Sequence, residues 1–251
     1  MVNLVEPEIT TPSLSSEGGD KDGGLSPSTP PPQTSRDWAA LPRDILCEVF
    51  RRTRHADILC GAGLACTAWR GVAAEEPALW RRVDLYEEDY REELGYWTGR
   101  MAMGRAAVDR SRGQCESFRG PADRYLLLYL ANRAPSLRSL QVTSLWCLPN
   151  AFVDLVIPKM PMLEVLTMAG GYLMPSTLHA LLRHCPRLDL LDTGQCALHH
   201  EITFRLLDEC HSKFNVVKVV PGRSPMCFCW TCHLESNGLL AYAYNLDNII
   251  F

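Results

Sequence analysis

A repeated pattern of apolar residues in the second half of the chain constrains the fold more than any other feature. Each copy has a lead residue, a second apolar residue three positions later and, in three of the copies, a third apolar residue two positions after that. The lead residues are Leu137, Leu163, Leu188 and Phe214, which lie 26, 25 and 26 positions apart. Such regular spacing indicates a structural unit that stacks on copies of itself, because one unit of this size cannot bury its apolar face alone.

Each copy is preceded by a helical stretch with an apolar residue seven positions before the lead: Leu130, Val156, Leu181 and Leu207. The unit is therefore expected to be a helix, a turn and a short strand. A period near 25 with this pattern is the signature of the leucine-rich repeat. We expect a short α/β solenoid of about four such repeats over residues 111–221, with degenerate copies near residues 83–85 and 114–118.

The strands of these repeats predict a binding surface. Successive side chains of a strand point to opposite faces, so Leu140 and Val142 are expected to face the core and their neighbours to face outward. Extended faces of this kind suit the recognition of a protein. The alternative is a plain solvated face. The candidate substrate-binding residues are Ser139, Gln141, Val165, Thr167, Leu190, Asp192, Val216 and Lys218.

Residues 38–85 carry a second pattern. It consists of Leu41-Pro42, then Cys66-Thr-Ala-Trp69-Arg70, then Leu79-Trp80-Arg81. Residues 42–52 are predicted to be a helix that begins at Pro42, because proline suits the first helical position. Four apolar residues at positions i, i+1, i+4 and i+5 give this helix one apolar stripe, formed by Ile45, Leu46, Val49 and Phe50.

The order and spacing of these pieces resemble an F-box. Together with the repeats they resemble a small plant family of F-box/LRR proteins, the SKIP19-like type. The resemblance implies an all-α module over residues 37–85 that packs on the Skp-type adaptor of a Skp–cullin–F-box ubiquitin ligase. It implies adaptor binding by Leu41, Pro42, Ile45, Leu46, Val49, Phe50, Leu64, Cys66 and Trp69. The alternative is that these side chains only pack against the repeats.

The expected function is accordingly substrate recognition for that ligase, without catalysis by this chain. A module of about 45 residues is too small to be stable through its own core, which favours an apolar stripe that docks on a partner. The alternative function is that of a leucine-rich repeat interaction protein outside any ligase, with residues 37–85 as an N-terminal cap. A cysteine hydrolase using Cys196 and His199 would need an orienting third group, and none is evident.

Composition narrows the choice of partners. The net charge of −4 and the pI of about 6.0 give no electrostatic case for nucleic-acid binding. No apolar run approaches the length needed to span a membrane. The 11 cysteines and an acidic N-terminus without a secretory signal indicate a reducing compartment, hence the cytoplasm, the nucleus or both. The partners expected are the adaptor, through it a cullin, and an unknown protein substrate.

The rest of the chain is expected to be irregular. Residues 1–36 are rich in Ser, Thr, Pro and Gly and are predicted to be a disordered tail. Residues 86–110 are predicted to be a connecting segment, and residues 222–251 an irregular tail. The cluster Cys227-x-Cys229-x-x-Cys232-His233 has ligand residue types, but its four members are too close together for one tetrahedral zinc site. No metal site and no cofactor is therefore expected.

Overall fold

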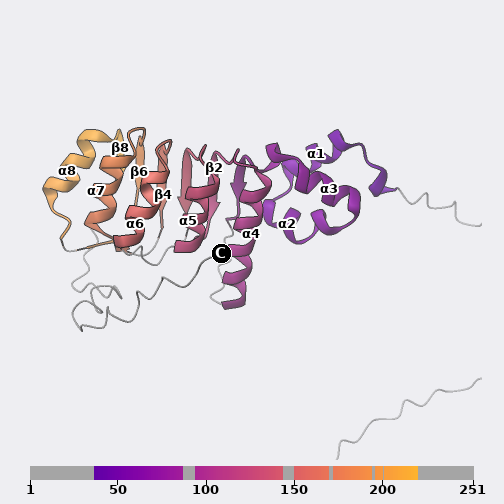
Figure 1. Ribbon diagram of the computed structural model, residues 1–251, viewed down its shortest axis with the longest axis horizontal. Helices are drawn as coiled ribbons and strands as arrows, with labels where there is room; N and C mark the ends of the chain where they lie inside the picture. The colour runs from indigo at the N-terminus through magenta and orange to yellow at the C-terminus, as the bar shows by residue number, and fades with distance from the viewer. Residues whose placement is uncertain are drawn as a thin grey trace, which may run out of the picture. The chain divides into compact units, whose positions relative to one another are not determined.

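The computed structural model describes residues 37–86, 94–143, 150–169, 172–193, 196–199 and 201–219. These residues fall within one compact unit, Asp37–Phe251, in which a helical region is followed by an α/β region (Figure 1). The tails expected at residues 1–36 and 222–251, with the Cys227–His233 cluster, lie outside the described residues. None of the described helices combines the length and apolar character of a bilayer-spanning segment.

The helical region is built from short elements. They are η1 (Trp38–Ala40), α1 (Arg43–Arg52), α2 (His55–Cys60), η2 (Ala62–Leu64), α3 (Thr67–Glu75) and η3 (Pro77–Trp80). Charges at the ends of α1 suit the helix dipole, with Asp44 in the first turn and Arg51 and Arg52 in the last. Pro42 is the N-cap residue of α1 and has an extended backbone, so the helix begins at Arg43, one residue later than predicted.

The core of the helical region is centred on Trp80, which is fully buried. Its indole Nε1 donates a hydrogen bond to the carbonyl oxygen of Ala73 at 2.8 Å. A buried indole needs such a partner, because an unpaired N–H away from water is costly. Leu46, Phe50 and Ile58 complete this core at 1% exposure each. Their burial joins α1 and α2 to the start of the sheet, since all belong to one continuous apolar cluster.

The α/β region contains a six-stranded parallel sheet in the order β1-β2-β3-β4-β6-β8. Its strands are β1 (Arg82–Asp84), β2 (Ser117–Gly120), β3 (Ser139–Val142), β4 (Val165–Met168), β6 (Leu190–Asp192) and β8 (Val216–Lys218). A separate parallel pair joins β5 (Tyr172–Leu173) to β7 (Ala197–Leu198). Four strands of the large sheet, β3, β4, β6 and β8, follow directly on the lead residues of the repeated pattern.

Helices α4 to α8 lie in a row along one face of this sheet (Figure 1). They are α4 (Leu94–Arg110), α5 (Arg124–Arg133), α6 (Asn150–Val156) with η4 (Ile157–Lys159), α7 (Pro175–His184) and α8 (Phe204–Lys213). The four lead residues of the repeats are all buried between helices and sheet, at 4% exposure or less. The repeat period thus corresponds to one strand and one helix.

The structure adds an element to each of two predicted segments. The predicted connecting segment, residues 86–110, contains the 17-residue helix α4, which buries Ala107 and Val108 against the core. The predicted helical module over residues 37–85 includes β1, which pairs in parallel with β2 and so belongs to the sheet. The degenerate copies expected near residues 83–85 and 114–118 correspond to these two strands.

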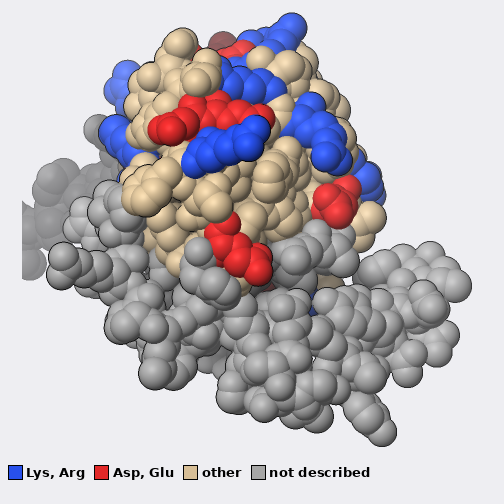
Figure 2. All heavy atoms as spheres, turned by 90° about the vertical axis from the view of Figure 1, so that its left-hand side faces the viewer, with Lys and Arg blue, Asp and Glu red and all other residues tan. Residues whose placement is uncertain are grey.

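The last strand of the large sheet, β8, has charged surroundings. Its outward side chains Val216 and Lys218 are exposed, and Lys218 lies 3.7 Å from Asp192 of β6. Figure 2 views the molecule from the side of α8 and shows lysine and arginine interspersed with aspartate and glutamate. Mixed charges at a sheet edge oppose pairing with other chains, because a foreign strand would have to desolvate them.

Candidate docking surfaces

Helix α1 has one buried side and one exposed side. Leu46 and Phe50 are each 1% exposed, whereas Ile45 is 53% and Val49 is 40% exposed. Ile45 and Val49 are one turn apart and form an apolar strip on the outer side of the helix, called the α1 strip below. Of the nine large exposed apolar side chains of the described residues, four lie between positions 38 and 64, which makes this region a candidate for protein contact.

The structure divides the nine residues predicted to bind an adaptor into three groups. Leu46 and Phe50 are buried in the core. Leu41, Cys66 and Trp69 are partly buried. Pro42, Ile45, Val49 and Leu64 are exposed. The predicted single stripe of α1 is therefore split, because consecutive residues of a helix differ by 100° in direction and only part of so wide a stripe can face the core. Adaptor binding by these residues stays a prediction.

Trp69 and Trp38 connect the exposed and buried parts. The ring of Trp69 meets that of Phe50 edge-on, with centroids 5.8 Å apart. Its Nε1 donates to the carbonyl oxygen of Trp38 at 2.9 Å, which holds η1 against α3. Trp38 itself is 59% exposed and was not among the predicted binding residues. The available signal was an aromatic residue placed three positions before Leu41 of the Leu41-Pro42 pair.

Charges around the strip are paired. Arg43 of α1 lies 3.6 Å from Glu75 and 3.5 Å from Glu76 at the end of α3. Glu48 accepts a hydrogen bond from Arg51, and this bond, followed by the charge of Arg52, lowers the pKa of that carboxyl. Most of these groups are substantially exposed and Glu76 is partly exposed, so the pairs contribute little to stability and leave the apolar strip as the distinguishing feature of α1.

The face of the large sheet opposite helices α4 to α8 carries two rows of side chains, most of them partly exposed. The strand register aligns Ser139, Val165, Leu190 and Val216 in one row and Gln141, Thr167, Asp192 and Lys218 in the other. The alternate residues of β3 and β4 are buried toward the helices. The structure thus brings together all eight residues predicted for this face. Their role in binding a substrate stays a prediction.

Both rows continue onto β1 and β2, which the sequence reasoning did not include. Arg82 and Ser117 extend the first row, and Asp84 and Arg119 extend the second. Arg119 lies 3.5 Å from Asp84, so the second row begins and ends with an ion pair. The signal for these four positions was the pair of degenerate copies near residues 83–85 and 114–118.

Cys196 and His199 do not form an activated nucleophile. Cys196 is 5% exposed, and its thiol donates to the carbonyl oxygen of Met168 at 3.5 Å. Burial, followed by the charge of Asp192, raises the pKa of Cys196 to about 11. The thiol is therefore protonated at neutral pH and is a poor nucleophile. Among the described residues, no group of three or more acidic, histidine or cysteine side chains is placed to hold a metal ion.

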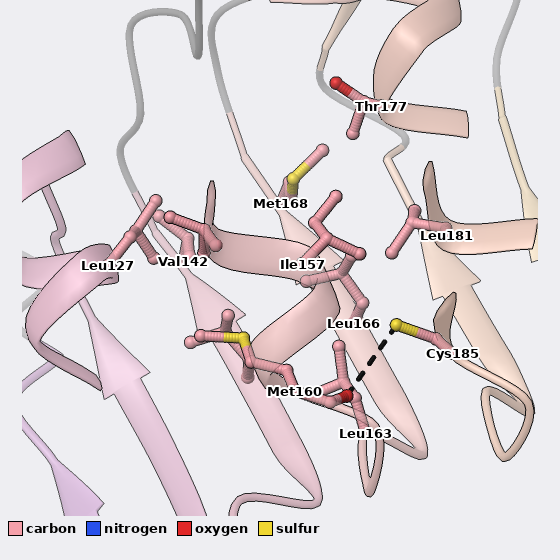
Figure 3. Close-up of a pocket in the computed structure, with 12 residues that line it drawn as sticks. Leu127, Val142, Ile157, Met160, Leu163, Leu166, Met168, Thr177, Leu181 and Cys185 are labelled. Atoms are coloured by element: carbon pink, nitrogen blue, oxygen red, sulfur yellow. Dashed lines mark hydrogen bonds between the residues drawn. The ribbon is translucent and has the colours of Figure 1, made fainter. Parts of the chain in front are cut away.

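An apolar cavity of about 30 Å³ lies between the sheet and the helices (Figure 3). Leu127 of α5, Val142 of β3, Ile157 of η4 and Leu181 of α7 point toward it. Cys185 at its edge donates to the carbonyl oxygen of Met160 at 3.7 Å. A space of this size equals the volume of about one water molecule and offers such a water few polar partners. The cavity is a packing defect and not a ligand site.

Comparison with known proteins adds a family to this geometry. The F-box-like family model matches residues 38–86. Domains of this kind generally bind Skp-type adaptors in cullin ligases. The match covers the helical region and β1, and so contains the α1 strip together with Trp38, Leu64 and Trp69.

Relatives in Arabidopsis thaliana extend the similarity into the α/β region. "Putative F-box/LRR-repeat protein 23" is 30% identical over 173 residues, which are 65% of this chain and 37% of the relative. "F-box protein SKIP19" is 31% identical over 136 residues, or 52% of this chain and 43% of the relative. "Putative F-box/LRR-repeat protein 22" is 29% identical over 181 residues, or 66% of this chain and 57% of the relative.

The matches to these relatives cover 37 to 57% of the length of each relative. The exposed strip on α1 lies within the matched domain, and most of the parallel sheet follows that domain in the chain. Residues 38–86 of the chain match the F-box-like family, and the chain is similar to F-box and F-box/LRR-repeat proteins of Arabidopsis thaliana.

Proposed function

We propose that the chain is a substrate-recognition subunit of a Skp–cullin–F-box ubiquitin ligase and that the α1 strip docks on the Skp-type adaptor. The observation that carries this proposal is the exposure of Ile45 and Val49 on a helix whose other side is fully buried. The F-box-like match over residues 38–86 supports it. Apolar side chains left in water on a well-packed helix gain free energy when a partner covers them.

The α/β region then serves as the substrate-binding part. We interpret it as a short leucine-rich repeat solenoid, supported by the period of the lead residues and by one strand and one helix per period. The two rows of outward side chains give a target protein a mixed apolar and polar surface. Val165 and Leu190 offer apolar contact area, while Gln141, Thr167 and Asp192 offer hydrogen bonds that fix orientation.

Recognition would accelerate ubiquitin transfer without any covalent step on this chain. Holding a target lysine near a charged ubiquitin-conjugating enzyme raises its effective concentration, which makes the transfer intramolecular in effect. No catalytic residue is required of this subunit, and the raised pKa of Cys196 to about 11 argues against thiol chemistry there. Residence in the cytoplasm or nucleus remains part of the proposal.

A second function is favoured by one observation. β1 lies within the F-box-like stretch and also forms the first strand of the large sheet, and the apolar core is continuous across both regions. The helical region therefore also covers one end of the sheet, as the N-terminal cap of a repeat protein does. In that case the chain would be an interaction protein acting outside any ligase.

Binding to a purified Skp-type adaptor separates the two functions. The variant Ile45→Asp/Val49→Asp should lose at least about a hundredfold in adaptor affinity, because two apolar anchors are replaced by charges that cannot be buried unpaired. Leu155→Asp is the matched control, since Leu155 on α6 is 52% exposed, much as Ile45 is. Affinity is measured by calorimetry on the full chain, and circular dichroism checks that each variant is folded.

If the parent chain does not bind the adaptor, the ligase function is contradicted and the capping function is favoured. Equal loss in Leu155→Asp and in the strip variant would show that the effect is not specific to α1. Retained affinity in the strip variant would remove the α1 strip as the docking site.

A further inference from the structure

Two adjoining hollows open between the end of α1, the start of α2 and strand β1. Their volumes are about 250 and 440 Å³, and Arg51 and His55 line both. Five arginines line the two hollows together, and they are called the arginine cleft below: Arg51, Arg52, Arg54, Arg81 and Arg82. They come from two stretches of sequence about thirty residues apart that the fold places side by side.

Among the described residues that line the hollows, the five arginines face two acidic residues, Asp84 and Glu116, so positive charge predominates there on a chain whose net charge is −4. Arg51 and Arg52 both pair with the carboxylate of Glu48, whose single negative charge can balance only one of the two positive charges. Arg82 forms no ion pair with any described residue. Arg54 pairs with Asp57 at 2.9 Å, and Arg81 pairs with Glu116 at 2.7 Å.

Arginines of the cleft that form an ion pair still have N–H groups that are not directed at that carboxylate. A guanidinium has five N–H groups, and Arg51, Arg52 and Arg81 each direct one nitrogen at a carboxylate. Their side chains are 56%, 79% and 56% exposed, so a ligand can reach the other donors. Such forked donors suit carboxylate groups, which can accept two parallel hydrogen bonds.

His55 holds the two sides of the cleft at a fixed separation. Its Nδ1 accepts a hydrogen bond from the backbone N–H of Asp84 at 3.3 Å, and its Nε2 lies 3.0 Å from the carbonyl oxygen of Leu79. Since Nδ1 accepts, Nε2 is the nitrogen that donates to the Leu79 carbonyl oxygen. The ring also packs at 5.4 Å from Trp80. Because these contacts hold the backbone segments that carry the arginines, less conformational freedom is lost when the cleft binds a ligand.

We propose that the arginine cleft binds an aspartate- and glutamate-rich segment of the protein substrate. Arg82 belongs to the same outward row as Ser117, Ser139 and Val165, so a polypeptide lying on the sheet face continues directly into the cleft. The guanidiniums are spread over two hollows, which suits several carboxylates along an extended segment better than one compact phosphate. This inference rests on the proposed substrate recognition and narrows its substrate class.

The test measures binding of a fluorescent peptide in which aspartate and glutamate alternate with serine, using the full chain and fluorescence anisotropy. The parent chain should bind this peptide, and the affinity should fall as salt is added, because exposed charge pairs are screened. The variant Arg81→Gln/Arg82→Gln should bind about tenfold more weakly. The control Arg124→Gln/Arg133→Gln removes the same charge from exposed positions of α5 and should bind as the parent does.

Three outcomes would overturn the proposal. The first is equal binding of a peptide with asparagine and glutamine in place of the acids. The second is equal loss of affinity in the two double-arginine variants. The third is binding of a peptide with one phosphoserine among neutral residues when the acidic peptide does not bind, which would assign the cleft to phosphate.

Residues 87–93 include five acidic residues and follow directly on Tyr86, which lines the smaller hollow. A variant with these five replaced by Asn and Gln is therefore measured in parallel. Peptide binding by this variant but not by the parent chain would overturn the proposal for the chain as it exists.

Adaptor binding keeps the two proposals distinguishable. Arg81→Gln/Arg82→Gln should leave adaptor affinity unchanged, whereas Ile45→Asp/Val49→Asp should leave peptide affinity unchanged. Loss of peptide binding in the strip variant would contradict a separate cleft, and this result does not depend on whether the adaptor binds.

Discussion

Ile45 and Leu46 are neighbours in the sequence with opposite environments. Ile45 is 53% exposed and Leu46 is 1% exposed, although both are large aliphatic residues on the same helix. Burial of these two residues therefore depends on the direction in which each side chain points and not on the residue type. Leu46 points toward the core shared with Phe50 and Trp80, whereas Ile45, 100° away around the helix, lies outside that core and is more than half exposed.

The pair gives a residue-scale prediction. Leu46→Ala should lower the free energy of unfolding by about 2 to 4 kcal/mol, because it leaves a cavity in a packed core. Ile45→Ala should change it by less than about 0.5 kcal/mol and instead weaken adaptor binding. Urea denaturation followed by circular dichroism measures the first quantity, and calorimetry the second. Similar destabilisation by both variants would show that Ile45 is not a surface residue.

Helix α4 forms although its sequence has a weak helical pattern. Of its three glycines, Gly99 and Gly104 lie in the helix interior, where glycine is unfavourable by about 1 kcal/mol relative to alanine. Packing accounts for one of the two. A Cβ at Gly104 would lie 2.7 Å from a methyl carbon of Leu126 on α5, whereas a Cβ at Gly99 would meet nothing within 4 Å. Close contact with α5 therefore requires glycine at position 104 alone.

Two alanine substitutions test this difference within one helix. Gly99→Ala should raise the free energy of unfolding by about 0.5 to 1 kcal/mol, because it restricts the unfolded chain and favours the helix. Gly104→Ala should lower it by about 1 kcal/mol, since the fully buried Leu126 has no room to move and the strain exceeds the gain in propensity. Chemical denaturation of both variants decides the matter. Stabilisation by Gly104→Ala would mean that α4 and α5 are not packed closely there.

At the scale of the whole molecule, the α/β region buries thiols with raised pKa values. Burial raises the pKa of Cys115 to about 12 and the pKa values of Cys185, Cys196 and Cys210 to about 11, from an ordinary value of 9.0. The folded state therefore keeps these thiols protonated at a pH where the unfolded chain has released the protons. Their neutral burial stabilises the fold below pH 9, and that stabilisation is lost as the pH rises toward 11 and 12.

Alkaline pH should accordingly unfold the protein through these four cysteines. The free energy of unfolding should be constant near neutrality and fall progressively above about pH 9, because the unfolded state binds fewer protons there. Substituting Cys210 by alanine should reduce the slope of this decline, as one titrating thiol is removed. Thermal denaturation at a series of pH values in the presence of a reductant measures the slope. An unchanged slope would show that Cys210 ionises alike in both states.

The sequence by itself located the repeating unit and the F-box-like stretch, because both are local patterns of apolar residues at regular spacing. Strands β3, β4, β6 and β8 lie where the lead residues Leu137, Leu163, Leu188 and Phe214 predict them, since burial of a lead residue fixes the strand that follows. The eight outward residues of the sheet face followed from strand alternation alone. Helix α4 was missed because its glycines weaken the helical pattern.

Tertiary structure alone decided which side of α1 faces water and which arginines meet in one cleft. Periodicity shows that Ile45, Leu46, Val49 and Phe50 are apolar, but the side that is buried depends on where the other elements pack. Arg51 and Arg82 are distant in sequence and share a surface because the fold places the end of α1 beside β1, where His55 hydrogen-bonds to Asp84. Local patterns specify elements through short-range physics, whereas exposure and proximity depend on contacts between residues far apart in the chain.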